Sequence, residues 1–321
     1  MNTTNELRKS IKALIAEKKV DLFLAWEKGS LPLTATPLFV STEDQADRAV
    51  FDVTCGNNLS IYFTKDRKQF ANRKVGIAVK GCDARSVVLN ILEKQIQREN
   101  VVIVGVPCDG VLDRKKVLAK TDGREVLELI DNGETVTVKG NGFDLLLNRN
   151  EILSSSCLAC TYPDAQEYDV FIGDARGEVP NESRLKEIHD FQALSASERW
   201  DKTRNEYERC IRCYACRNVC PSCYCNVCFV DQNDPKWIGS TCDYTDTLIF
   251  HVIRNLHVAG RCVECGACQR ACPMDIDLLM LNRKVAMEVK DRFGDIAGLD
   301  INGKPAMSDF REDEKQKFIM G

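Results

Sequence analysis

Apolar and polar residues along the first half of the chain follow the pattern of an α/β protein. Apolar residues recur at helical spacing in residues 7–19 and again in residues 83–99. Short apolar runs predict four strands, over residues 20–26, 49–55, 74–82 and 100–108. Because the helix over residues 83–99 joins two of these strands, the segment forms a strand–helix–strand crossover, which requires parallel strands.

The pattern changes beyond these strands. Residues 126–140 contain two alternating runs on either side of Asn132 and Gly133, which predicts a β-hairpin with a tight turn. Residues 167–175 predict one further strand. Residues 176–208 are polar and irregular, which is typical of a linker, and we expect one helix within it.

Two runs of cysteines in the second half of the chain have the spacing C-x2-C-x2-C-x3-C-P. They are Cys210, Cys213, Cys216 and Cys220, and Cys262, Cys265, Cys268 and Cys272. This spacing is typical of a pair of [4Fe–4S] clusters. The alternatives are zinc, which is bound by separate C-x2-C pairs, and disulfides, which require an oxidising compartment that nothing in the sequence indicates.

The fourth cysteine of each motif determines how the ligands divide between the two clusters. In two-cluster ferredoxins this cysteine binds the cluster of the other motif. We therefore predict two ligand sets, named here the cluster 1 set and the cluster 2 set. The cluster 1 set is Cys210, Cys213, Cys216 and Cys272, and the cluster 2 set is Cys262, Cys265, Cys268 and Cys220.

Five more cysteines lie in the α/β part of the chain. Cys55, Cys82 and Cys108 end predicted strands, at the edge where parallel sheets bind their ligands. Cys157 and Cys160 form a C-x2-C pair in a polar turn. We predict a third cluster on Cys82, Cys108, Cys157 and Cys160, the third set, with Cys55 as the substitute ligand. The alternative for each strand-end cysteine is a small, buried apolar side chain.

A fourth group of thiols follows the first motif. It consists of Cys223, Cys225, Cys228 and Cys242, the fourth set. These residues could bind an additional cluster or zinc. The alternative is that some of them shield the neighbouring cluster, because a C-x-C sequence leaves little room for two ligands of one metal.

Charged residues adjoin two of these groups. Lys80, Asp83 and Arg85 flank Cys82 and are candidate contacts of an anionic cofactor, with solvated loop charge as the alternative. Three arginines flank the first motif: Arg209, Arg212 and Arg217. Because positive charge favours the reduced cluster, we expect cluster 1 to have the higher potential, unless these arginines serve solubility or partner docking.

Composition narrows the functional classes. The chain has 321 residues, of which 44% are hydrophobic and 29% charged, and a net charge of −4. This charge gives no basis for binding nucleic acid or an anionic membrane surface, and we expect no membrane insertion. The 17 cysteines indicate a reducing compartment, and the charged N-terminus lacks a signal-peptide core. We therefore expect the cytoplasm of an organism that protects oxygen-sensitive clusters.

These patterns together predict four parts. We expect an α/β domain with a parallel sheet over residues 1–175, which also holds the third cluster. A linker over residues 176–208 leads to a mostly helical, ferredoxin-like domain with two [4Fe–4S] clusters over residues 209–290. Residues 291–321 form an extended tail. No nucleophile motif, G-x-G-x-x-G or P-loop sequence is present, so we predict no catalytic residue.

Residues 74–86, 101–110 and 154–175, in this order, resemble the beta subunits of deazaflavin-coenzyme hydrogenases and dehydrogenases. The cysteine-rich residues 209–228 and 250–284 resemble iron–sulfur subunits associated with heterodisulfide reductase-type flavoproteins, beta subunits of sulfhydrogenases and the A subunit of anaerobic sulfite reductase. The resemblance implies an electron-relay subunit of a multisubunit complex, whose partners are flavoprotein, hydrogenase or dehydrogenase subunits.

One feature of the deazaflavin-reducing subunits is missing from this chain. They carry a D-G-G-x-V-T stretch for FAD and substrate near the N-terminus, and this chain has none. We therefore favour a relay subunit without FAD. The alternative is a flavin-containing catalytic subunit that reduces or oxidises a nicotinamide or deazaflavin coenzyme.

Overall fold

The computed structural model describes residues 2–70, 72–180, 182–306 and 308. Its N-terminal part is built on a six-stranded sheet with the order β2-β1-β4-β5-β9, in which β3 also pairs with β1. The strands are β1 (Leu22–Lys28), β2 (Ala35–Val40), β3 (Ala49–Val50), β4 (Val75–Val79), β5 (Val101–Gly105) and β9 (Val170–Phe171). Strands β1, β4, β5 and β9 are parallel, whereas β2 and β3 are antiparallel to β1.

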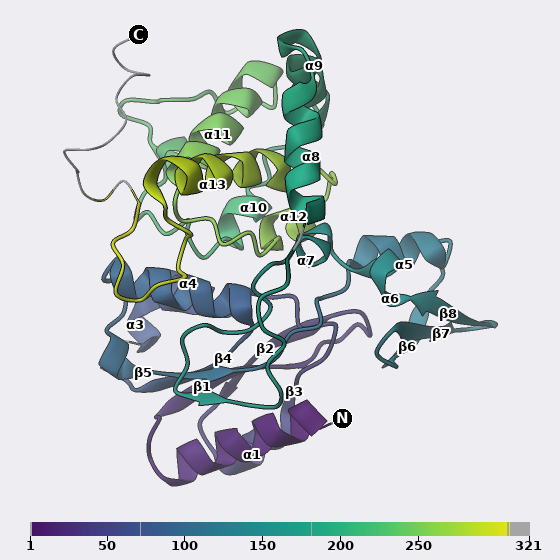
Figure 1. Ribbon diagram of the computed structural model, residues 1–321, viewed down its shortest axis with the longest axis vertical. Helices are drawn as coiled ribbons and strands as arrows, with labels where there is room; N and C mark the ends of the chain where they lie inside the picture. The colour runs from purple at the N-terminus through teal and green to yellow at the C-terminus, as the bar shows by residue number, and fades with distance from the viewer. Residues whose placement is uncertain (1, 71, 181, 307, 309–321) are drawn as a thin grey trace.

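The expected crossover between β4 and β5 is present. Helix α4 (Gly81–Leu92) connects these two parallel strands and covers one face of the sheet, while α1 (Asn2–Ala16) covers the other (Figure 1). The apolar side chains of both strands are buried between these layers, which explains their nearly continuous hydrophobic sequences. Short helices complete this part: η1 (Glu43–Arg48), α2 (Ile61–Lys65), α3 (Arg67–Phe70) and η2 (Arg98–Asn100).

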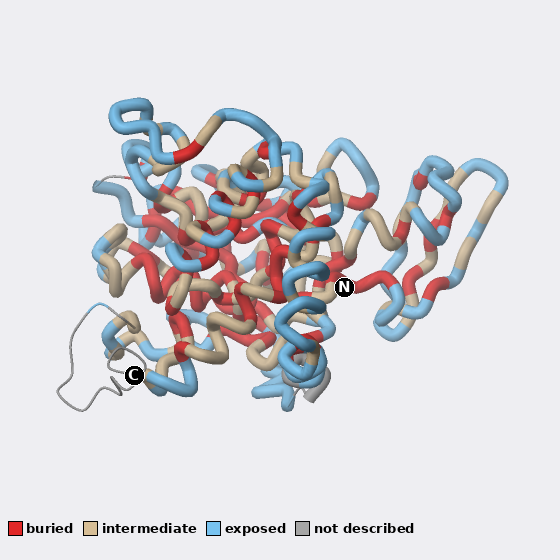
Figure 2. The backbone as a smooth tube through the Cα atoms, turned by 90° about the horizontal axis from the view of Figure 1, so that it is seen from above, coloured by how far each residue is buried: buried red, intermediate tan, exposed pale blue. Residues whose placement is uncertain are grey.

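A second, three-stranded antiparallel sheet projects from the body of the molecule. It consists of β6 (Val126–Asp131), β7 (Thr135–Gly140) and β8 (Phe143–Asn148), flanked by α5 (Arg114–Lys120) and α6 (Arg149–Ile152). The hairpin predicted across Asn132 and Gly133 is the β6–β7 pair. A small core of its own stabilises this unit, centred on Val117, Val136 and Val138. Figure 2 shows it as a largely exposed lobe.

The segment expected to be a linker is more ordered than the sequence indicated. It contains two helices rather than one, α8 (Glu182–Ala193) and α9 (Ala196–Tyr207). They follow the short helix α7 (Ser155–Leu158) and strand β9, and they pack against the C-terminal helices α13 and α11, respectively. The few buried residues of α8 and α9, such as Ile188 and Tyr207, are spread over mostly polar sequences, so the pattern was weak.

The C-terminal part is helical, as expected. Its elements are α10 (Ala215–Asn218), η3 (Phe229–Asp231), α11 (Tyr244–His257), α12 (Ala267–Ala271) and α13 (Leu279–Phe293). It lies on the α4 side of the central sheet (Figure 1). Helix α13 extends past residue 290, and the following residues return to α4, where Arg85 Nε donates to the carbonyl of Ala297 at 2.9 Å. Residues 309–321 of the expected tail lie outside the described residues.

The fold class is therefore confirmed, with an α/β N-terminal domain and a mostly helical C-terminal region. The predicted strand over residues 49–55 is the two-residue strand β3, which is antiparallel to β1, and the antiparallel strand β2 is an addition to the expected sheet. Among the described helices, none has the length and apolar character needed to cross a membrane.

Candidate metal centres

The two cysteine motifs adopt the same local backbone. In both motifs, the residue two positions after the first cysteine has a left-handed backbone, with φ of 50° at Arg212 and 58° at Glu264. The residue four positions after the first cysteine is left-handed as well, with φ of 58° at Tyr214 and 71° at Gly266. This geometry turns backbone N–H groups toward sulfur: Arg212 N donates to Cys210 Sγ at 3.4 Å. A short helix, α10 or α12, then begins in each motif, and the two helices pack together.

The fourth cysteine of the second motif lies with the cysteines of the first. Burial, together with negative charge at Cys216, Cys272 and Cys213, raises the pKa of Cys210 to about 11. Cys216 and Cys272 also share one apolar cluster with Phe250 of α11. The structure thus brings the four residues of the cluster 1 set together.

The reciprocal arrangement holds for Cys220. Burial raises the pKa of Cys262, as do the negative charges of Glu264, Cys268 and Cys220. Burial likewise raises the pKa of Cys268 to about 12, with Cys220 and Cys265 acting in the same direction. The four residues of the cluster 2 set therefore also face one another.

The third set lines a cavity of about 570 Å³ between the two domains. Cys82 lies in the first turn of α4, Cys108 follows β5, and Cys157 and Cys160 flank the end of α7. Burial raises the pKa of Cys108 to about 12, and negative charge at Cys157 and Cys160 adds to this effect. Cys265 of the cluster 2 set lines the same cavity.

Backbone donors are directed at two of these thiols. Gly110 N donates to Cys108 Sγ at 3.4 Å, and Val111 N donates to Cys157 Sγ at 3.3 Å. Such donors stabilise the thiolates that ligate a cluster. Cys55, the expected substitute, is buried outside this cavity, and its thiol is directed at the carbonyl of Val50 at 3.7 Å.

The fourth set is only partly assembled. Cys223, Cys225 and Cys228 line a pocket of about 160 Å³, and Cys242 is an exposed residue that is not part of its lining. A hydrogen bond from Cys223 lowers the pKa of the buried Cys220 thiol. Cys223 is therefore in contact with the cluster 2 set.

The donor chemistry of the sets suits cubane clusters. All 17 cysteines lie in the described part of the chain and are free thiols, which are the ligands that clusters require. Within the described residues, no three histidine, cysteine or carboxylate side chains converge on a single ion. A cubane instead needs thiolates arranged around its body, and the 570 Å³ cavity offers such a space to the third set.

The charged residues beside Cys82 are buried, which rules out the solvated-loop alternative. Lys80 and Asp83 form an ion pair of 2.7 Å with exposed side-chain fractions of 3% and 0%. Lys80 Nζ also lies 4.0 Å from the centre of the Trp26 ring. Lys80 and Arg85 line the cavity of the third set, whereas Asp83 is turned toward Lys80 and is not part of the lining.

The arginines that flank the first motif all have carboxylate partners. The ion pairs are Arg209 with Glu206 at 2.6 Å, Arg212 with Asp246 at 3.5 Å, and Arg217 with Asp231 at 2.7 Å. A neighbouring carboxylate offsets most of the field of a cation. The expected higher potential of cluster 1 therefore loses much of its basis, because that expectation counted only the arginines.

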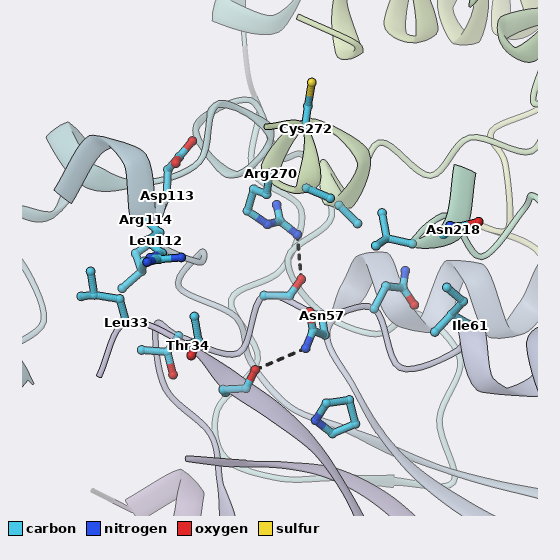
Figure 3. Close-up of a pocket in the computed structure, with 18 of the residues that line it drawn as sticks. Leu33, Thr34, Asn57, Ile61, Leu112, Asp113, Arg114, Asn218, Arg270 and Cys272 are labelled. Carbon is cyan, nitrogen blue, oxygen red and sulfur yellow. Dashed lines mark hydrogen bonds between the residues drawn. The ribbon is translucent and has the colours of Figure 1, made fainter. Parts of the chain in front are cut away.

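A larger cavity, of about 720 Å³, was not predicted from the sequence (Figure 3). It lies between the loops at the carboxyl edge of the central sheet and the cysteine motifs, and it reaches Cys272. Arg270 crosses this region and donates from Nη2 to the carbonyl of Gly56 at 2.7 Å. Its lining comes from segments that are far apart in sequence and share no motif, so the pattern of residues held no signal for it.

An α/β domain joined to a helical domain with two ferredoxin motifs defines a class of iron–sulfur proteins. Residues 209–277 match the family described as a 4Fe-4S dicluster domain. The chain is also 25% identical, over 90% of both chains, to the F420-dependent formate dehydrogenase subunit beta of Methanocaldococcus jannaschii. The F420-dependent formate dehydrogenase 1 subunit beta of Methanococcus maripaludis is 24% identical, over 92% of this chain and 91% of that one.

A solved structure is similar to part of the chain. The F420-reducing [NiFe] hydrogenase complex of Methanosarcina barkeri contains a chain with 16% sequence identity and a TM-score of 0.39, over 49% of this chain and 58% of that one. The resemblance to deazaflavin-coenzyme dehydrogenase beta subunits that carry a dicluster domain, which the sequence suggested, is confirmed by the two formate dehydrogenase subunits and the dicluster match.

Proposed function

We propose that the chain is an iron–sulfur electron-relay subunit of a multisubunit redox complex. It passes single electrons between a flavoprotein, hydrogenase or dehydrogenase partner and a second acceptor. The two beta-subunit relatives support a role inside a dehydrogenase complex. Three cubane clusters supply the one-electron chemistry, bound by the cluster 1, cluster 2 and third sets.

The order of the three sets along the molecule is the observation that carries this proposal. Cys265 of the cluster 2 set lines the cavity of the third set. The pKa of Cys82 is raised mainly by burial and by the negative charge of Asp83, and negative charge at Cys265 raises it as well. On the other side, Cys268 and Cys216 share one apolar cluster, which joins the cluster 2 and cluster 1 sets. The cluster 2 set therefore lies between the third set and the cluster 1 set and adjoins both.

The surface exposure of the sets indicates where electrons leave or enter. In the cluster 1 set, Cys213 is exposed and its neighbour Ile211 is 51% exposed. In the cluster 2 set, Cys268 is buried and the other three cysteines are partly buried. The cluster 1 end is therefore open to a partner, the cluster 2 set in the middle has no exposed cysteine, and the third set faces a cavity at the other end.

The 720 Å³ cavity favours a second candidate function, that of a flavin-containing catalytic subunit. Four cations line it, Lys65, Arg114, Lys115 and Arg270, together with Tyr62 and several aliphatic side chains. Cations and an aromatic surface suit the phosphates and the ring of a flavin nucleotide. Such a subunit would exchange hydride with a deazaflavin or nicotinamide coenzyme and pass the electrons on singly to cluster 1.

Anaerobic purification with quantification of iron, sulfide, zinc and flavin separates these candidates. About twelve irons per chain without flavin support the relay with three clusters, and about eight irons limit it to two. Stoichiometric flavin favours the catalytic subunit. Zinc without sulfide contradicts both candidates.

Substitution of the C-x2-C pair tests the ligands of the third cluster. We expect Cys157→Ser/Cys160→Ser to lose about four irons per chain, because two of four thiolate ligands are removed. Cys55→Ser and Cys242→Ser serve as controls and should keep the wild-type iron content. A loss of iron in Cys55→Ser would transfer the ligand role to that residue, and a loss in Cys242→Ser would indicate a metal on the fourth set.

A further inference from the structure

Arg254 is a buried cation between the two ferredoxin-type ligand sets. It lies on α11, one turn after Phe250, which packs in the same apolar cluster as Cys216 and Cys268. Its exposed fraction is 4%. Arg254 Nη2 donates to the carbonyl of Cys216 at 3.3 Å, and its side chain also lines the pocket that contains Cys223.

Within the part of the chain that the structure describes, Arg254 has no carboxylate partner. Among the described residues no ion pair is formed by Arg254, and its Nε is buried without a hydrogen-bond partner. Two other arginines of this domain are equally buried, but each has a carboxylate. Arg212 pairs with Asp246 at 3.5 Å, and Arg283 pairs with Glu187 at 2.9 Å.

The groups that face Arg254 with negative charge are cysteines. Burial lowers the pKa of the guanidinium, whereas the negative charge that Cys268, Cys220, Cys223 and Cys216 carry as cluster ligands raises it. The neighbouring His251 adds no second positive charge, because burial together with the positive charges of Arg254 and Arg212 lowers its pKa to about 3 and keeps it neutral. A buried guanidinium without compensation is costly, so the sulfur ligands are the charge that balances it.

We propose that Arg254 is a positioning residue for electron transfer, a fixed cation shared by clusters 1 and 2 that raises the reduction potentials of both. This inference rests on the proposed relay function. Each transfer moves one electron from a cluster to its neighbour, so that the donor is oxidised as the acceptor is reduced. The reduced cluster is the more negative form, and a nearby cation in a poorly polarisable interior favours it.

The test is a redox titration of the anaerobically purified full chain, followed by electron paramagnetic resonance, with iron and sulfide measured in every sample. We expect Arg254→Gln to keep its iron and to shift both potentials downward. Arg254→Lys, which retains a positive charge, should show a smaller shift. Arg209→Gln is the control, because Arg209 adjoins Cys210 but is exposed and paired with Glu206; it should show no shift.

The outcomes separate this inference from the relay proposal. A wild-type chain without clusters contradicts the relay itself. Unchanged potentials in an Arg254→Gln protein that keeps its iron overturn only the role of Arg254. If Arg254→Gln loses its iron, Arg254→Lys decides: full iron content with potentials close to the wild type supports the role of the charge. A loss of iron in Arg254→Lys as well shows a purely structural role and overturns the inference.

Discussion

At the scale of single residues, Lys80 and Asp83 form a buried ion pair beside the third set. Both side chains are closed to solvent. Burial lowers the pKa of Lys80, but the negative charges of Asp83, Cys82 and Cys108 outweigh it and raise the pKa. Lys80 is therefore charged in the folded protein, and its ammonium also donates to the carbonyl of Asn57 at 3.3 Å.

Replacing only one partner of this ion pair should destabilise the protein much more than replacing both partners with apolar residues. We expect Lys80→Met to lower the free energy of unfolding by roughly 3–5 kcal/mol, because it leaves the carboxylate of Asp83 buried without a partner. Lys80→Met/Asp83→Leu should be more stable than Lys80→Met alone, since no isolated charge remains. Urea unfolding under anaerobic conditions, at equal iron content, measures both. If the double variant loses as much unfolding free energy as Lys80→Met and Asp83→Leu lose together, the two residues are not coupled.

The residue scale also shows what the sequence could and could not predict. The eight motif cysteines could be proposed as ligands from the sequence because cluster ligation requires a fixed local spacing. The sequence did not predict the burial of Lys80 and Asp83. Their position next to Cys82 does not indicate which distant segments of the chain cover them. Arg254 carried no signal at all, because it lies in an ordinary amphipathic helix and its position relative to sulfur depends on the packing of α11.

At the scale of secondary-structure elements, periodic segments were predicted well and polar ones poorly. The sequence predicted α1, α4 and the β6–β7 hairpin, each of which has a clear apolar repeat or a turn signal. It predicted one helix where the structure has two, α8 and α9, because the buried positions of these helices are few. These helices are stabilised by tertiary contacts, such as the ion pair between Glu187 and Arg283, that a local pattern does not contain.

Helix α11 yields a prediction about pH. His251 stacks on Tyr207 with ring centres 4.2 Å apart, and its pKa is lowered to about 3. An unfolded histidine titrates near 6.5, so the unfolded chain binds a proton that the folded chain excludes between these values. The contribution of His251 to stability is thus complete above about pH 6.5 and is lost as the pH falls toward 3.

His251→Phe keeps an aromatic ring against Tyr207 but cannot bind a proton. Between pH 7 and pH 5, we expect the wild-type chain to lose about 2 kcal/mol more unfolding free energy than this variant. Anaerobic urea unfolding at both pH values measures the difference, and the acid lability of the clusters is common to the two proteins. Parallel pH profiles would show that His251 does not titrate as the structure indicates.

At the scale of the whole molecule, the carboxyl edge of the central sheet faces the cysteine motifs. Arg270 and Gly56, which are 214 residues apart, are in direct contact across this boundary. The parallel strands predicted that this edge would bind ligands, and the third set lies there. The sequence could not predict that the dicluster domain would cover the same edge, because no local pattern encodes contacts between such distant segments.

The segment after α13 completes this arrangement by returning to α4. Gly298 has a φ of 69°, and a Cβ atom at this position would lie 2.0 Å from the carbonyl oxygen of Arg85. Gly294, which ends α13, has a φ of 70° but open space around it. The two glycines share the same backbone conformation, so a comparison of alanine variants isolates the contact with α4.

We expect Gly294→Ala to cost about 1–2 kcal/mol of unfolding free energy, the strain of a left-handed alanine. Gly298→Ala should cost clearly more, because the methyl group also forces the segment away from α4, where Arg85 lines the cavity of the third set. Hydrogen exchange should then be faster in residues 295–306 and at the start of α4 for Gly298→Ala alone. Equal stability losses and equal exchange in the two variants would mean that this segment does not depend on close packing against α4. The α/β domain and the second motif would then hold the third set without a contribution from residues 295–306.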